Sequence, residues 1–285
     1  MTARLLSRHP PARCSPEDRR PHPFAAYGGR AVWNSEKYLK YSDAQTRAFE
    51  DLSARIGARE PRRVVDLGCG PGDLTAALSR RWPQALVTGI DSSPAMVAKA
   101  REHGVQAELG DIREWNPSAD TDVLLCHTAI HWVPEHPKLI ASWLSDLPDG
   151  SWFGMCSPDD AGDGIHSLVE EVADRPHWRE LISDCVLRLD EAMRSPDEYY
   201  DLLEQQGFRP EVWQSRHWRC LHGDDALLND LEAAPLRPIR ARLDDEKWEA
   251  FRAEFAPLLR QEYPQHTDGT TRFSTRMLFV VGHRP

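Results

Sequence analysis

Two aspartates flank a glycine-rich turn in the first third of the chain. A short apolar run leads into Asp66, and Gly68, Gly70 and Gly72 follow at alternate positions. A second apolar run ends in Asp91, 19 residues after Gly72. Glycines at this spacing let the chain turn sharply and bring bare backbone close to a ligand. Two carboxylates beside such a turn predict a ligand that presents a cation and hydroxyl groups.

This pattern favours S-adenosylmethionine over a nicotinamide dinucleotide. A dinucleotide fingerprint needs a third glycine at position 73, where this chain has Asp73, and Asp66 would face a pyrophosphate. S-adenosylmethionine has an ammonium and a sulfonium but no phosphate, so Asp66 suits its amino acid end and Asp91 its ribose hydroxyls. Alternatively, Asp66 is a helix N-cap and Asp91 a cap before Ser92-Ser93-Pro94. Both acids at this spacing favour the cofactor interpretation.

Composition and charge narrow the class of protein. The 285 residues are 40% hydrophobic with 10 Trp and 8 Phe, enough for the core of one large domain. A net charge of -10 argues against a nucleic acid or an anionic membrane as partner, and favours a small substrate. Neither a long apolar run nor a secretory signal is present, so we expect a cytoplasmic protein, with a monomer favoured. The six scattered cysteines have no metal-ligand spacing, and no metal site is expected.

Strand and helix signals alternate between residues 62 and 157. We expect strands at 62–67, 85–90, 105–109, 121–126 and 151–156, and helices at 73–82, 94–103 and 136–146. This alternation with short turns predicts a parallel sheet covered by helices. Ligands of such sheets bind beyond the carboxyl ends of the strands, where Asp66, Asp91, Asp111 and His127 are expected.

The C-terminal half has a looser pattern. A capped helix is expected at 195–206, an extended segment at 208–221, helices between 224 and 263 with breaks near Pro235 and Pro238, and a last strand around 277–281. This order predicts that the sheet ends in an antiparallel pair whose connection folds over the ligand. Before the sheet, residues 33–56 suit an amphipathic helical lead-in.

The chain resembles the class I S-adenosylmethionine-dependent methyltransferases and, within them, the trans-aconitate 2-methyltransferases. The wider resemblance rests on residues 64–72, Asp91 and Gly110-Asp111-Ile112. The narrower one rests on ordered motifs at residues 33–39, 91–96, 129–136, 195–200, 236–238, 263–269 and 276–281. The resemblance implies an α/β fold: a Rossmann-like, mostly parallel seven-stranded sheet with helices on both faces and a helical cap inserted near the C-terminus. It implies one methyltransferase domain at 31–285, with cap insertions at 158–195 and 222–272. Residues 1–30 are rich in Arg and Pro without apolar periodicity, so we expect a disordered tail or an upstream start there.

The resemblance also assigns site residues. It implies that the cofactor is held by Asp66, Gly68 and Gly70 at the methionine end, Asp91 at the ribose, Ser92 and Met96 at the adenosine wall, Asp111 and Ile112 at the adenine, and by His127. It implies that the acceptor lies near His131 and Trp132, with Trp33, Arg47, Arg237 and Arg276 as substrate-binding candidates. Trp132 could instead pack in the core, His131 could be a polar residue with satisfied hydrogen bonds, and each arginine could be surface charge or pair with a carboxylate.

Two departures from the family lie near the expected acceptor pocket. The family usually has Asn-Ala where this chain has Thr128-Ala129, and Gly-Gly followed by a Gln-containing strand where this chain has Asp149-Gly150 and residues 154–157.

The chemistry depends on the acceptor. A carboxylate has a pKa of about 4 and is a nucleophile at neutral pH without a general base, so a small polycarboxylic acid such as trans-aconitate would be converted into a monomethyl ester. The alternative is a phenol, alcohol or amine of a secondary metabolite, which would need a base such as His131 and a rate that falls through a pKa near 6.5. A cofactor-binding protein without transfer activity is a further possibility. A nicotinamide oxidoreductase is disfavoured by Asp66 and Asp73.

Overall fold

The fold is built on one seven-stranded sheet. The computed structural model describes residues 46–159, 164–186, 193–232 and 235–285. The strand order is β3-β2-β1-β4-β5-β7-β6, and only β7 runs antiparallel to its neighbours β5 and β6. The strands are β1 (Arg63–Leu67), β2 (Leu86–Asp91), β3 (Gln106–Leu109), β4 (Thr121–His127), β5 (Trp152–Pro158), β6 (Arg209–His222) and β7 (Thr270–His283). The predicted, mostly parallel sheet with an antiparallel pair at its end is confirmed.

Helices cover both faces of this sheet, as predicted. Residues 46–54 and the helices α2 (Asp73–Arg81) and α3 (Pro94–Glu102) lie on one face, and α4 (His136–Asp146) and α8 (Pro196–Gln205) lie on the other. Successive side chains of β7 point to opposite faces of the sheet, and both of these faces are apolar. Phe279 joins the cluster that contains Phe49, whereas the next residue back, Leu278, joins the cluster that contains Trp143.

Local signals explain where the helices begin. The side chain of Ser195 caps α8 by accepting a hydrogen bond from the Glu198 N–H, and the Glu198 side chain accepts one from the Ser195 N–H. Ser93 caps α3, with Pro94 in the first turn. These are the start signals that the sequence presents.

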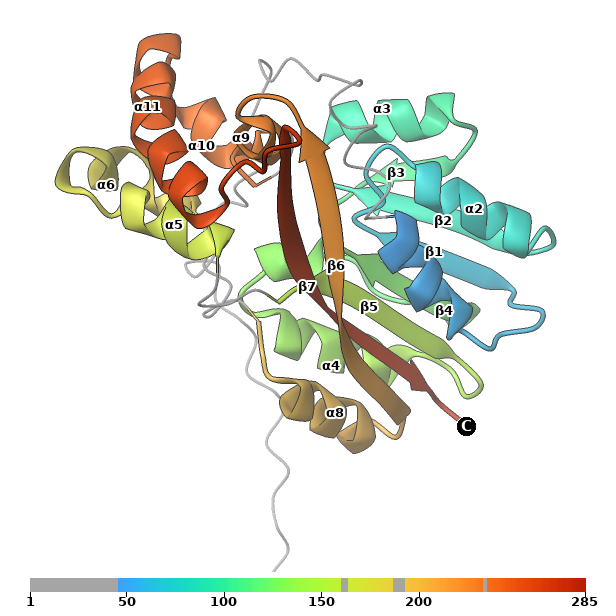
Figure 1. Cartoon of the computed structure of the whole chain (residues 1–285). Helices are drawn as coiled ribbons and strands as arrows, with labels where there is room; N and C mark the ends of the chain where they lie inside the picture. The colour runs from blue at the N-terminus through green and yellow to red at the C-terminus, as the bar shows by residue number, and fades with distance from the viewer. Residues whose placement is uncertain (1–45, 160–163, 187–192, 233–234) are drawn as a thin grey trace, which may run out of the picture.

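β6 and β7 extend beyond the other strands as a two-stranded arm and meet a group of helices at its far end (Figure 1). The group consists of α5 (Ile165–Ala173), α6 (Pro176–Ile182), η3 (Ser183–Cys185), α9 (Ala226–Leu231), α10 (Arg237–Arg242) and α11 (Asp245–Glu262). These helices share one hydrophobic cluster with Phe273 of β7. Two segments far apart in the sequence therefore pack as one body, which we call the cap.

The predicted lead-in is described only in part. Residues 46–54 are helical and bury Phe49 and Leu52 against the sheet. Trp33, the rest of the lead-in and the predicted tail at 1–30 lie outside the described residues. Among the described helices, none has the length and apolar character that a membrane crossing requires.

Candidate functional site

Asp66 lies buried at the carboxyl end of β1. Its side chain is 3% exposed and accepts a hydrogen bond from Thr75 Oγ1 at 2.6 Å. The N-cap of α2 is Gly72, so the alternative that Asp66 caps this helix is wrong. Burial raises the pKa of Asp66 to about 6, and the nearby Asp91 adds to this rise. A bound cation would favour the ionised form of this carboxyl group.

Asp91 organises the glycine turn. The Gly70 N–H donates to Asp91 Oδ2 at 2.9 Å, and the Ser93 N–H donates to Asp91 Oδ1 at 2.8 Å. Burial raises the pKa of Asp91, whereas these two bonds and the nearby Arg237 guanidinium lower it. The cap of α3 is Ser93, not Asp91. Because a carboxylate oxygen has more than one acceptor site, Asp91 can still receive a hydroxyl group from a ligand.

The glycine turn itself offers no backbone donor to an anion. The N–H groups of Gly68 and Cys69 both donate to Ile90 O, at 2.7 Å and 3.0 Å. The Gly72 N–H donates to Cys69 O at 3.2 Å, Gly70 is bound to Asp91, and Pro71 has no N–H. A phosphate loop works by presenting free N–H groups. This turn therefore suits a ligand without phosphate.

Ser92, Met96, Asp111 and Ile112 follow the ends of β2 and β3. Ser92, Met96 and Asp111 are partly exposed, and Ile112 is buried. The Arg113 N–H donates to Asp111 Oδ1 at 2.9 Å, and Arg113 Nε lies 3.0 Å from both carboxylate oxygens. Asp111 is thus already engaged by a neighbouring cation, which the sequence analysis did not anticipate.

The glycine turn touches the loop that follows β4. Gly68 has φ of +76°, and a Cβ atom there would lie 2.2 Å from Ala129 Cβ. Only glycine fits both the backbone conformation and this approach. The contact places the turn directly beside η2 (Ile130–Trp132), where the acceptor was expected.

Thr128 has an unusual backbone conformation, with φ of +53°. A β-branched residue is strained in this left-handed region, whereas asparagine tolerates it. This chain therefore adopts the conformation with a residue type that does not favour it.

His127 ends β4 beside this loop. Its side chain is 5% exposed and packs edge-on against Phe49, with ring centroids 5.5 Å apart. Nδ1 lies 3.4 Å from Thr128 Oγ1, but Nε2 is buried and has no hydrogen-bond partner in the described part of the chain. Burial lowers the pKa of His127 to about 3, so the imidazole is neutral at physiological pH.

His131 and Trp132 lie next to one another in η2. Their ring centroids are 5.4 Å apart, and His131 Nδ1 lies 3.4 Å from Ser157 Oγ of β5. Burial lowers the pKa of His131 to about 3, helped by neighbouring histidines that include His166 of the cap helix α5. An imidazole with so low a pKa is a weak base.

A buried pair that the sequence analysis missed holds this loop in place. His136 Nδ1 donates to Val133 O at 2.7 Å, and Tyr199 Oη of α8 donates to His136 Nε2 at 2.6 Å. Both side chains are fully buried. They belong to two of the family-like motifs, at 129–136 and 195–200, but nothing in the sequence indicates that the motifs touch.

The candidate arginines differ in their surroundings. Arg237 begins α10 and is close enough to lower the pKa of Asp91, so the cap reaches the end of β2. Arg276 Nε donates to Asp159 O at 2.8 Å and lies 3.4 Å from Asp159 Oδ2. Arg47 is exposed on the first described helix. The structure therefore places Arg237 and Arg276 at the carboxyl edge of the sheet but brings Arg47 into no described contact there.

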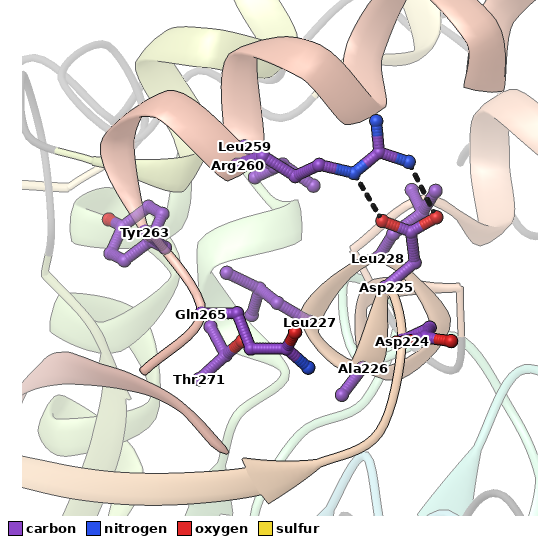
Figure 2. Close-up of a pocket in the computed structure, with 10 residues that line it drawn as sticks. All are labelled: Asp224, Asp225, Ala226, Leu227, Leu228, Leu259, Arg260, Tyr263, Gln265 and Thr271. Atoms are coloured by element: carbon purple, nitrogen blue, oxygen red, sulfur yellow. Dashed lines mark hydrogen bonds and ion pairs between the residues drawn. The ribbon is translucent and has the colours of Figure 1, made fainter. Parts of the chain in front are cut away.

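A hollow of about 230 Å³ lies elsewhere, within the cap between α9 and α11. Figure 2 shows that its one arginine, Arg260, is held by both carboxylate oxygens of Asp225. Tyr263, Gln265 and Thr271 complete its wall, and no residue of the glycine turn takes part. The hollow is separate from the site at the strand ends.

The chain is similar to known methyltransferases over most of its length. A family model described as a methyltransferase domain matches residues 64–150. A trans-aconitate 2-methyltransferase of Mycobacterium sp. (strain KMS) is 46% identical over 250 residues, which cover 88% of this chain and 98% of that protein. Another, of Mycobacterium marinum (strain ATCC BAA-535 / M), is 44% identical and is covered to 95%.

Solved structures share the fold at low identity. The YcgJ protein of Bacillus subtilis has a TM-score of 0.53 and 16% identity, over 86% of this chain and 99% of that one. Phosphoethanolamine N-methyltransferase 2 of Haemonchus contortus, in complex with S-adenosylhomocysteine, has a TM-score of 0.51 and 15% identity over 84% of this chain. The chain spans 52% of that longer protein. These likenesses show the class I methyltransferase fold.

Proposed function

We propose that this chain, which belongs to the trans-aconitate 2-methyltransferase family, transfers a methyl group from S-adenosylmethionine to one carboxylate of a small polycarboxylic acid and releases a monomethyl ester. The observation that carries the proposal is the 46% identity to a relative of that name over 98% of its length. Trans-aconitate is the first acceptor to test.

The residues at the strand ends fit the cofactor. When bound, S-adenosylmethionine supplies an electrophilic methyl group on its sulfonium. We propose that Asp66 faces the positively charged amino acid end and that Asp91 receives the ribose hydroxyls, with Ser92, Met96, Asp111 and Ile112 around the base. The occupied N–H groups of the glycine turn support a ligand without phosphate.

No residue of the site needs to remove a proton from a carboxylate acceptor. His127 and His131 are neutral and weakly basic, since burial lowers the pKa of each to about 3. This property disfavours an alcohol, phenol or amine acceptor, whose proton would have to be taken by such a base. The task left to the chain is to orient the acid and exclude water.

Arg276 and Arg237 are the cations that we propose for the remaining carboxylates of the acid. Both lie at the carboxyl edge of the sheet, Arg276 on the arm and Arg237 on the cap. His131 and Trp132 would form the wall beside the reacting carboxylate. We further propose that the helical insertions at 158–195 and 222–272 close over the site, since Arg237 of α10 already influences Asp91.

The test uses methyl-labelled S-adenosylmethionine and a panel of di- and tricarboxylates, phenols and amines. We expect label in a product of trans-aconitate that mild alkali releases as methanol, because esters hydrolyse whereas methyl ethers and N-methyl groups do not. The Asp91→Ala variant tests the cofactor site in the same assay and should give less labelled product than the parent protein when the cofactor is limiting. Alkali-stable label on a phenol or amine, with none on any acid, would refute the proposal.

A further inference from the structure

The cofactor's methionine portion presents a problem that the glycine turn does not solve. Its α-carbon carries both an ammonium group and a carboxylate, so both groups must lie close together wherever the amino acid end binds. Asp66 suits the ammonium but repels the carboxylate. The N–H groups from Gly68 to Gly72 are all used within the protein, so the carboxylate needs a donor from another element.

His127 is placed to be that donor. In the parallel pair of β1 and β4, Asp66 is the partner of Leu125. Beyond this pair, β4 ends at His127, and β1 ends at Leu67, where the glycine turn begins. Gly68 in turn touches Ala129, so the glycine turn is in contact with the segment that begins at His127. Asp66 and its partner Leu125 point to the same face of the sheet. Because side chains alternate along a strand, His127 points to this face as well, and Cys126 points to the other.

The ring also has an unsatisfied atom. The side chain of His127 is only 5% exposed, and its buried Nε2 has no hydrogen-bond partner among the described residues. A buried polar atom without a partner costs about 1–3 kcal/mol, so such atoms are rare unless a ligand satisfies them. Phe49 packs against the ring and fixes its orientation.

We propose that His127 Nε2 carries the ring proton and donates it to the α-carboxylate of the cofactor. The Thr128 hydroxyl donates to Nδ1, 3.4 Å away, and thereby selects this tautomer. This inference rests on the cofactor of the proposed function but not on the identity of the acceptor.

Calorimetry without an acceptor tests it, with S-adenosylhomocysteine and methylthioadenosine as ligands. Methylthioadenosine keeps the adenosine and the sulfur but lacks the amino acid end. We expect His127→Leu to weaken S-adenosylhomocysteine binding by about tenfold or more, the scale of one hydrogen bond to a charged group. Methylthioadenosine should bind as before. Without ligand, the thermal midpoint of this variant should not fall, since an unpartnered polar atom has been removed.

Two further variants identify the atom. The amide nitrogen of His127→Gln reaches the position of Nε2 and should restore most of the affinity, whereas that of His127→Asn corresponds to Nδ1 and should not. This comparison also decides the matter if the leucine variant does not fold. His222→Leu, at an exposed position at the end of β6, is the control. Equal losses for both ligands, or none for S-adenosylhomocysteine, would overturn the proposal, and either result would leave the acceptor test unaffected.

Discussion

Lowering the pH should reduce the free energy of unfolding, and the contribution of one buried histidine to this loss can be measured. His136 is 0% exposed and is held between Val133 O and Tyr199 Oη. Burial lowers its pKa to about 4, from an ordinary value of 6.5. The perturbation is His136→Gln, which removes the titrating group and leaves an amide in its place.

The sign and the size of the change in unfolding free energy follow from the difference in proton binding between the folded and unfolded states. Above pH 6.5 neither state binds the proton, and below it the unfolded chain binds the proton first, so the free energy of unfolding falls as the pH falls towards 4. Between pH 7.5 and 5.5 a single histidine with these values removes about 1.4 kcal/mol. Asp66 acts in the opposite direction, because its pKa is raised to about 6 in the folded protein. Because Asp66 is present in both the parent protein and the His136→Gln variant, its contribution cancels when the two are compared.

Urea denaturation at the two pH values measures this difference. His136→Gln should be less stable at both, since it disturbs two buried hydrogen bonds, but its loss between pH 7.5 and 5.5 should be about 1.4 kcal/mol smaller than that of the parent protein. His222→Gln, at an exposed position, should keep the parent difference. An unchanged pH dependence in His136→Gln would refute the reasoning and would mean that the folded protein admits a proton at this site.

Three further predictions concern the turn, the loop and the arm. Gly104→Ala should cost about 1 kcal/mol of stability, because φ is +79° and no atom of the described residues lies within 4 Å of the added Cβ. Gly68→Ala should cost about 2 kcal/mol more and lose cofactor affinity, because its Cβ meets Ala129, and equal costs in urea denaturation would contradict this packing argument. Thr128→Asn should raise the free energy of unfolding by about 0.5–1 kcal/mol, since it relieves a positive φ, and a decrease would speak against strain there. Arg276→Ala should raise the KM for the acid about tenfold while the KM for the cofactor stays within about twofold, and steady-state kinetics with the reverse pattern would exclude Arg276 as an acid-binding residue.

The placement of Asp66, Asp91 and the glycine turn at one edge of the sheet could be predicted because the information for it is local. The strand ends, the glycine spacing and the two aspartates all fall within a short stretch of sequence, and parallel topology brings such ends to one edge. The side chains that bind Asp66 and Asp111 within the protein could not be predicted. Thr75 binds Asp66 from the first turn of α2, and Arg113 binds Asp111, yet neither pairing follows from a pattern of residue types.

The loop after β4 was harder, because distant segments determine its shape. His136 is 63 residues from Tyr199, and the two motifs that contain them gain their connection only through the fold. The strain at Thr128 is equally invisible in the sequence, although the sequence analysis noted an expected departure from the family at this residue. A residue type can mark such a place, but the backbone conformation explains it.

The acceptor side depends on how the cap meets the sheet, and this explains why the arginines could not be ranked from the sequence. Arg276 lies on a strand and is bound to Asp159, whereas Arg237 comes from the cap and acts on Asp91. Arg237→Ala should therefore weaken cofactor binding as well as acid binding, because it removes a cation that favours the ionised Asp91. Arg276→Ala should affect the acid alone. We propose that the same residue type acts on two ligands and that only its neighbours distinguish the roles, so the difference between these two variants tests the assignment.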